Sequence, residues 1–168
     1  MHGEAEREYV EYVSARLPAL RRAAHLLCRD EHRADDIVQA TTTALYCNWR
    51  RAQAADSIDA YVHRMLVRKY LDDRRLSWAG VRLMRQTPDA VEHPVSRIED
   101  REQLRAALAR LSHAQRTVLV LRFVCDLSVE QVAEILGCSQ SNVKSHCARG
   151  LAAMRQTLNG DEISLERG

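Results

Sequence analysis

Apolar residues recur at intervals of three and four along most of the chain, the spacing of one face of an α-helix. The first such run extends from Tyr9 to Cys28 and contains Pro18, which should bend or interrupt a helix. Two further runs reach from Asp30 to about Trp49 and from Ile58 to about Leu76. Strand-like alternation is lacking, and only three prolines and six glycines occur. The pattern therefore predicts an all-α fold.

The helical periodicity fails between Trp78 and Val95, a stretch that holds Gly80, Pro88 and Pro94. It returns from Ile98 onward. We therefore predict two small helical domains, residues 1–78 and 98–160, joined by a flexible linker at residues 79–97 and followed by a polar tail at 161–168. The polar residues 1–8 are expected to fray, and residues 50–57 are expected to form a loop.

The stretch from Asp126 to Leu158 reads as two helices joined by a tight turn. Ser128 and Gln131 form the S-x-x-Q pattern of a capping box, in which each side chain satisfies a free backbone N–H. Gly137 is the expected left-handed residue that ends the first helix, and Ser139 can cap the second. This helix-turn-helix pattern suggests DNA binding, because its second helix can lie in the major groove.

The predicted second helix has two contrasting sides. One side is apolar and holds Val143, Cys147, Gly150, Met154 and Leu158. The opposite side holds Ser141, Lys144, Ser145, Ala148, Arg149 and Arg155. No acidic residue occurs between Ser139 and Leu158, and a purely cationic strip suits a polyanion. The alternative is an ordinary helical hairpin packed within a bundle.

Two further charged surfaces are predicted in the first domain. A basic stripe on the third helix comprises Arg64, Arg68 and Arg75, flanked by Lys69 and Arg74 and diluted by Asp72 and Asp73. Asp35, Asp36 and Gln39 face outward from the second helix. Those acids either complement the helix dipole on a solvated face or form a docking face for a basic partner.

Composition narrows the classes of function. The net charge is only +2, so any contact with nucleic acid must come from local segregation of charge. Five cysteines without a CxxC pair favour reduced thiols in a cytoplasm, and no four-ligand zinc set or cofactor motif is evident. No signal peptide or membrane-spanning apolar run is present, which predicts an intracellular protein that does not enter a membrane.

Two motifs resemble those of the extracytoplasmic-function sigma factors, a compact bacterial class that retains only regions 2 and 4. The region 4 signature is similar to DLSVEQVAEILGCSQSNVKSHCARGLAAMR, and the region 2 motif is similar to RADDIVQATTTALY at Arg33 to Tyr46. The resemblance covers almost everything from Tyr9 to Leu158. The chain departs from the family pattern at Ser141-Asn142, where the family has Gly-Thr, and at His146, where it has arginine.

The resemblance implies a transcription initiation factor with two partners, core RNA polymerase and promoter DNA, and with no catalytic residue, metal or cofactor. The clamp helices of the polymerase's largest subunit would bind Asp35, Asp36, Gln39 and Thr43, and the polymerase flap is a further contact. The −10 element would be bound by Arg50, Arg51, Ser57, Arg64, Arg68, Lys69, Arg74 and Arg75. The −35 element would be bound by Ser139, Gln140, Ser141, Asn142, Lys144, Ser145, His146 and Arg149. Many family members are also held by an anti-sigma protein.

Two other functions remain open at this stage. A stand-alone helix-turn-helix regulator would need a dimer and a palindromic operator, and would leave the acidic helix without a role. A metal-dependent nucleic-acid enzyme could use Asp35 with Asp36 or Asp72 with Asp73. Adjacent residues on a helix point about 100° apart, however, which is poor geometry for a shared metal.

Overall fold

The chain is folded entirely as helices and connecting turns across the part that the computed structural model describes, residues 2–28, 30–81 and 100–166. The first group of helices comprises α1 (His2–Leu27), α2 (Glu31–Cys47), α3 (Trp49–Gln53) and α4 (Ile58–Val81). The second comprises α5 (Asp100–Ala109), α6 (His113–Leu119), the π-helical turn η1 (Val120–Val124), α7 (Val129–Leu136) and α8 (Gln140–Glu166). The predicted all-α class is confirmed.

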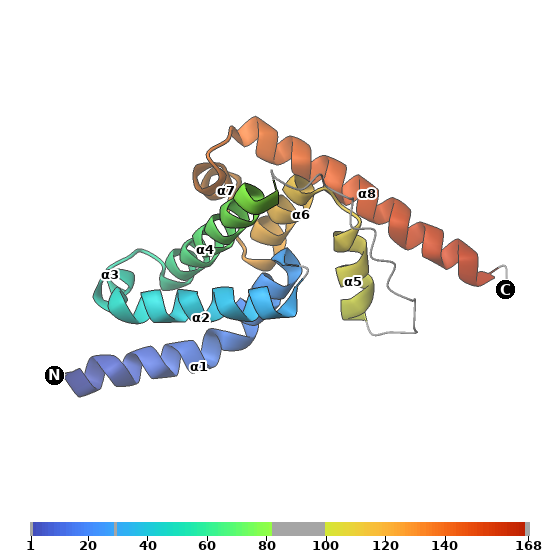
Figure 1. The fold of residues 1–168 in the computed structure, drawn as a ribbon. Coiled ribbons are helices and arrows are strands. Elements are labelled where there is room, and N and C mark those ends of the chain that lie inside the picture. The colour runs from blue at the N-terminus through green and yellow to red at the C-terminus, as the bar shows by residue number, and fades with distance from the viewer. Residues whose placement is uncertain (1, 29, 82–99, 167–168) are drawn as a thin grey trace.

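The first group is built around α2, which packs against both α1 and α4. Asp30 caps α2 by accepting hydrogen bonds from the backbone N–H groups of His32 and Arg33. The inner face of α2 is buried at Ala34, Ile37, Val38 and Leu45. Helix α1 contains Pro18, and its ribbon changes direction along its length in Figure 1, as expected where proline removes a backbone hydrogen bond.

Several predicted boundaries are wrong. Residues 3–8 do not fray but begin α1, because Glu8 accepts a hydrogen bond from Gln53 at 2.6 Å and the Tyr9 hydroxyl donates to the Thr42 carbonyl at 2.7 Å. The loop predicted at residues 50–57 is largely the short helix α3. Helix α8 extends to Glu166, beyond its predicted end at Leu158.

The predicted linker is described only at its start. Helix α4 runs on to Val81, so residues 79–81 are helical, and the rest of the predicted linker lies outside the described residues.

In the second group, α8 is the longest element and packs against α5, α6 and α7. At Gly150 it lies tightly against α6, since a Cβ atom there would lie 2.9 Å from Leu119 Cδ1. Ser112 and Gln115 form a capping box at the start of α6. The π-helical turn that follows α6 has no signal in the sequence pattern.

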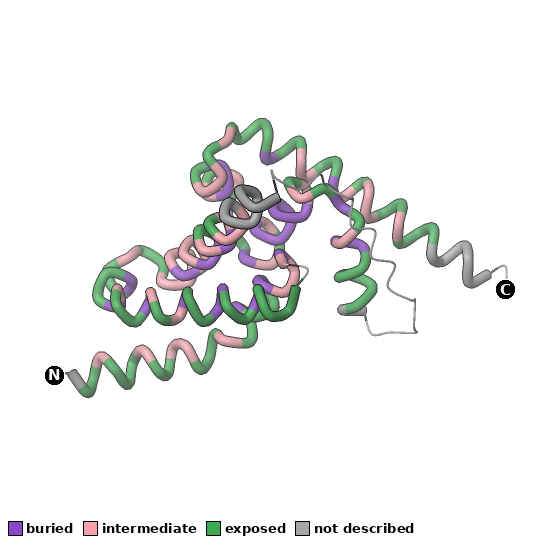
Figure 2. Tube along the Cα trace, viewed as in Figure 1, coloured by how far each residue is buried: buried purple, intermediate pink, exposed green. Residues whose placement is uncertain are grey.

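The two groups of helices share one apolar core rather than standing apart. Helix α1 contacts η1, and α4 contacts α7. Buried side chains of both groups, including Leu27, Leu66, Leu121 and Val132, belong to a single cluster. Figure 2 shows the buried segments gathered where the two groups meet. The domains predicted from the sequence therefore touch each other directly.

Candidate nucleic-acid interface

The turn between α7 and α8 has the local chemistry that the sequence predicted. Ser128 Oγ accepts a hydrogen bond from Gln131 N, and Gln131 Oε1 accepts one from Ser128 N, which completes a capping box. Gly137 ends α7 in the left-handed conformation with φ of 65°. Ser139 Oγ accepts a hydrogen bond from Asn142 N at the start of α8. The Ser128–Gln131 box starts α7, whereas Gly137 and Ser139 form the turn that leads into α8.

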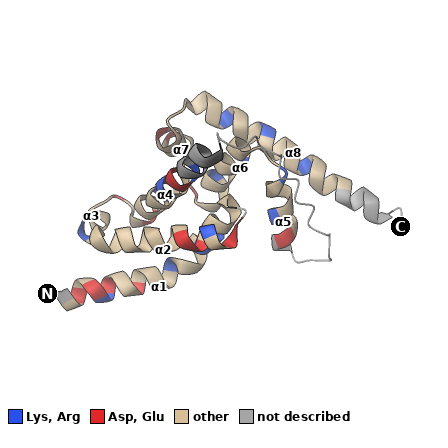
Figure 3. Cartoon of the chain, viewed as in Figure 1, with Lys and Arg blue, Asp and Glu red and all other residues tan. Residues whose placement is uncertain are grey.

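Burial of the apolar side of α8 leaves its polar side in solvent. Val143 is fully buried against the core. All the side chains predicted to face outward are exposed: Ser141, Lys144, Ser145, Ala148, Arg149 and Arg155. Ser139, Gln140 and Asn142 are exposed as well. No acid occurs from residue 140 to residue 160, and in Figure 3 this part of α8 carries blue segments for Lys and Arg and no red segment for Asp or Glu.

His146 differs from its neighbours on α8. Its side chain is half-buried, and its Nδ1 is enclosed without a hydrogen-bond partner in the described part of the chain. The exposed cations of the helix are therefore Lys144, Arg149 and Arg155 rather than His146.

The basic residues of α4 lie at different depths. Arg68 is exposed, whereas Arg64, Lys69 and Arg74 are half-buried, and the side chain of Arg75 lies outside the described residues. Arg64 forms an ion pair with Glu134 of α7, with Nη2 and Oε2 3.9 Å apart. Burial lowers the pKa of Arg74; the nearby Tyr70 raises that pKa and the nearby Arg116 lowers it.

The predicted −10 residues that precede α4 lie on and after α3. Arg50 and Arg51 are exposed on α3, and Ser57 is exposed just before α4, where its Oγ accepts a hydrogen bond from Ala60 N. Arg50 and Arg51 line a surface hollow of about 520 Å³ between α1, the end of α2 and α3.

The same hollow is also lined by three aromatic side chains that no sequence motif connects. Tyr9, Tyr46 and Trp49 line it. The Tyr9 ring contacts Tyr46 and Trp49 edge-on, with centroids 5.1 and 5.6 Å apart. Tyr46 is 55% exposed, whereas Trp49 is buried with no hydrogen-bond partner for its Nε1 in the described structure. The residues lie far apart in the sequence, so only the folded chain shows this cluster.

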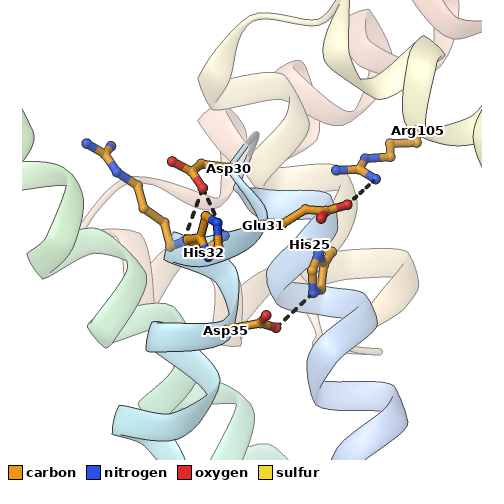
Figure 4. Close-up of polar contacts among 7 residues, drawn as sticks. His25, Asp30, Glu31, His32, Asp35 and Arg105 are labelled. Atoms are coloured by element: carbon orange, nitrogen blue, oxygen red, sulfur yellow. Dashed lines mark hydrogen bonds and ion pairs between the residues drawn. The ribbon is translucent and has the colours of Figure 1, made fainter.

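The acidic residues of α2 lie on its outer surface near its N-terminus. Asp35, Asp36, Gln39 and Thr43 are all exposed. Figure 4 shows Asp35 paired with His25 of α1, at 3.2 Å, and Glu31 paired with Arg105 of α5, at 3.8 Å. Thr43 Oγ1 donates a hydrogen bond to the Gln39 carbonyl. Of the two acids of the predicted docking face, Asp36 is the one whose side chain forms no pair within the described residues.

The described cysteine and acidic residues do not come together to form a metal-binding site. No set of three or more His, Cys, Asp or Glu side chains that could hold a metal occurs within the described residues. The acidic pairs Asp35–Asp36 and Asp72–Asp73 therefore form no such site there.

Burial raises the pKa of Cys28 to about 11 and that of Cys125 to about 12, so both thiols stay protonated and poorly nucleophilic near neutral pH.

Comparison with known proteins identifies the family to which the chain belongs. The family model described as Sigma-70 region 2 matches residues 12–79, and the one described as Sigma-70, region 4 matches residues 101–154. The chain belongs to the sigma-70 family. It is a sigma factor of the extracytoplasmic-function type, the class that directs RNA polymerase to promoters.

Curated relatives extend the match over nearly the whole chain of this sigma factor. It is 34% identical to the RNA polymerase sigma-E factor of Streptomyces avermitilis, over 99% of this chain and 94% of that one. It is 31% identical to the RNA polymerase sigma-E factor of Streptomyces coelicolor, over 95% and 93% of the two chains.

A solved structure shares the fold of this sigma factor. The sigma factor RpoE of Bartonella quintana, crystallised with the anti-sigma factor NepR, superposes with a TM-score of 0.74 at 23% identity, over 91% of this chain and 98% of that one. Of the described helices, none is both long and apolar enough to cross a membrane.

Proposed function

We propose that this sigma factor docks on core RNA polymerase through α2 and holds promoter DNA through α3, α4 and α8, and that it catalyses no reaction itself. The main support for the proposal is that acidic and basic residues lie on different surfaces. The acidic face of α2 and the basic faces of α4 and α8 are separate surfaces, and they lie within the stretches that match regions 2 and 4.

The −35 contact in this proposal is made by the exposed polar side of α8. A helix held by a helix-turn-helix presents its first turns to the major groove. Gln140, Ser141 and Asn142 occupy that first turn, and Lys144, Ser145 and Arg149 follow on the same exposed side. Because Arg149 can form two parallel hydrogen bonds to a guanine or a phosphate, it is the preferred candidate for a specific contact. His146 lies deeper and contributes at the edge of this surface.

The −10 contact uses two neighbouring surfaces of the first group of helices. Arg64, Arg68, Lys69, Arg74 and Arg75 of α4 supply positive charge for the phosphates, and Ser57 caps the same helix. Beside Arg50 and Arg51, the hollow lined by Tyr9, Tyr46 and Trp49 exposes the ring of Tyr46. Cations beside an exposed aromatic ring, on which a base can stack, are a combination typical of sites for single-stranded nucleic acid.

The polymerase contact is assigned to Asp35, Asp36, Gln39 and Thr43, which project from one exposed face of α2. A basic partner surface on the clamp helices would complement these side chains. The His25–Asp35 pair occupies one of the carboxylates in the free chain. Docking therefore exchanges an intramolecular ion pair for an intermolecular one.

The proposed contacts with polymerase and promoter also suggest where this sigma factor acts and which kind of protein regulates it. A chain that works on RNA polymerase and chromosomal DNA belongs in the bacterial cytoplasm. Two of the similar solved structures are complexes, one of the sigma factor RpoE with the anti-sigma factor NepR and one of CnrH with the cytosolic domain of CnrY. An anti-sigma protein is accordingly proposed as the third partner of this sigma factor.

Affinity for core polymerase tests the proposal directly. Asp36→Lys reverses an exposed charge on the proposed docking face of α2, and Glu11→Lys makes the same change on an exposed position of α1. Wild type and Glu11→Lys should form a stable complex with core polymerase in a pull-down, whereas Asp36→Lys should bind about tenfold or more weakly.

Two results would contradict the proposal. Wild-type chain that fails to bind core polymerase but footprints a palindromic operator as a dimer would be a stand-alone regulator. Equal binding by Asp36→Lys and Glu11→Lys would remove α2 from the polymerase interface.

A further inference from the structure

Two residues on successive turns of α1 hold one carboxylate at the start of α4. The Tyr12 hydroxyl donates a hydrogen bond to Asp59 Oδ1 at 2.6 Å, and Arg16 Nη2 lies 3.0 Å from Asp59 Oδ2. Residues four apart on a helix lie on the same side, so Tyr12 and Arg16 can engage a single carboxylate together. Asp59 is thereby tied to α1 through both of its oxygens.

Asp59 lies close to the residues assigned above to the −10 contact. It is two positions beyond Ser57, the residue that caps α4. Helix α4 also packs against α3, which carries Arg50 and Arg51. The Asp59 side chain is 42% exposed. A carboxylate left uncompensated at this place would repel the phosphates of a bound strand.

The position of Asp59 in its helix explains the acid but not its cation. An acid in the first turn of a helix interacts favourably with the helix dipole, and Asp59 is the acid in the first turn of α4. That interaction needs no cation at the carboxylate. An ion pair with side chains 52% and 42% exposed also adds little to folding stability. The main consequence of the pairing with Arg16 is therefore for the local surface charge.

Arg16, rather than a neighbouring titratable group, supplies the positive charge. Burial lowers the pKa of His63, and Arg16 acts in the same direction while Asp59 opposes it, so His63 is mostly neutral at about pH 7.5. Burial and the hydrogen bond to Asp59 raise the pKa of Tyr12, which stays protonated. Within the described residues, the ion pair formed by Asp59 is the one with Arg16.

We propose that Arg16 is a positioning residue for the −10 contact: with Tyr12 it holds Asp59 against α1 and cancels its charge, so that this carboxylate does not repel the single strand. The inference rests on the −10 role proposed above for α3 and α4. It adds a side chain of α1 that acts through Asp59 and needs no contact of its own with DNA.

Variants that change one charge at a time separate this role from its alternatives. Arg16→Gln leaves the charge of Asp59 uncancelled. Asp59→Asn removes that charge but keeps an oxygen that can accept the Tyr12 hydrogen bond. The double variant carries neither charge. Arg21→Gln is the matched control, because it removes an exposed cation of α1 that forms no ion pair in the described part of the chain.

The experiment measures how the complex with core polymerase binds a labelled single-stranded DNA of about 20 nucleotides, with core polymerase alone as the baseline. At about 0.1 M NaCl, Arg16→Gln should bind about two- to fivefold more weakly than wild type, the effect of one partly screened charge. Asp59→Asn should bind at least as tightly as wild type, and the double variant should recover wild-type affinity. Arg21→Gln should match wild type.

Salt dependence and stability distinguish an electrostatic role of Arg16 from a structural one. The deficit of Arg16→Gln should shrink as NaCl is raised to about 0.3 M, because salt screens the uncancelled charge. Its melting temperature should lie within about 4 °C of wild type. A deficit that salt does not reduce would instead indicate a structural role and overturn the inference.

Two further results overturn the inference. Equal binding by Arg16→Gln and wild type would mean that Asp59 does not face the DNA. A double variant as weak as Arg16→Gln would mean that Arg16 contacts the strand itself. Both results leave the proposed function intact, whereas a wild-type complex that binds the strand no better than core polymerase alone contradicts the −10 role and with it the proposed function.

Discussion

At the scale of single residues, the exposed side of α8 separates side chains that can reach a base from those that only add charge. Arg149 lies one helical turn beyond Ser145 and is exposed, whereas His146 is half-buried with an enclosed Nδ1. The proposed recognition surface therefore exposes Arg149 and Lys144 more fully than the histidine that stands where the family pattern has arginine.

Replacing Arg149 with alanine tests that ranking. If Arg149 reads a base, Arg149→Ala in the polymerase complex should weaken promoter binding by about 1–3 kcal/mol and relax the preference at one −35 position. Arg110→Ala removes the same charge from an exposed position outside α8 and should have little effect. Competition between promoter fragments with single −35 base changes measures both effects. An unchanged base preference in Arg149→Ala would assign Arg149 to the phosphates or to no contact.

The five thiols provide a test of local burial. Cys47 is exposed, whereas burial raises the pKa of Cys28 to about 11 and that of Cys125 to about 12. Because the thiolate is the nucleophile, a raised pKa leaves less reactive sulfur at pH 8. Iodoacetamide at pH 8 should label Cys47 first and Cys125 last, as followed by peptide mass spectrometry. Faster labelling of Cys125 than of Cys47 would contradict the fold around η1.

Helix caps and turns, which depend only on residues close together in the chain, could be predicted from the sequence. Ser112, Ser128, Gly137 and Ser139 all perform the capping or turn roles that their neighbours in sequence specified. The hollow beside Arg50 could not be predicted, because Tyr9 joins Tyr46 and Trp49 only through the packing of α1 on α2.

At the scale of elements, the periodicity identified the long helices but not all their limits. At the start of α1, a side-chain contact between helices accompanies the limit that was wrong. The bond from Gln53 to Glu8 joins the start of α1 to α3, and neither residue signals the other in the sequence. The π-helical turn Val120–Val124 likewise has no compositional signal.

The contact between α6 and α8 depends on a residue without a side chain. A Cβ atom at Gly150 would lie 2.9 Å from Leu119 Cδ1 and 3.2 Å from its Cγ, and Leu119 is buried. Gly150→Val should therefore destabilise the fold by about 1–3 kcal/mol through overpacking. Urea unfolding of the full chain measures the loss.

Gly160, on the same helix, provides the control for Gly150. A Cβ atom there would meet nothing within 4 Å, so Gly160→Ala should be neutral or stabilising by up to about 1 kcal/mol through helix propensity. If Gly150→Val were as stable as wild type, α6 and α8 would not pack as closely as described.

At the scale of the whole molecule, the sequence predicted two helical domains but not their direct contact. The Tyr70–His113 and Arg64–Glu134 pairs join residues more than 40 positions apart. No local pattern marks such pairs, because each residue also suits an ordinary solvated or core position on its own helix. The separation of charge among α2, α4 and α8 was predictable, since each face is coded within a single helix.

Run-off transcription with core polymerase tests the central claim, that one chain engages both polymerase and promoter. Genomic fragments should yield discrete transcripts only when this sigma factor is added, and their start sites should share spaced −10 and −35 sequences. Asp36→Lys should reduce all transcripts together, while Arg149→Ala should reduce them according to their −35 sequence. Tight footprinting by the chain alone, with no added transcript from core polymerase, would contradict the account.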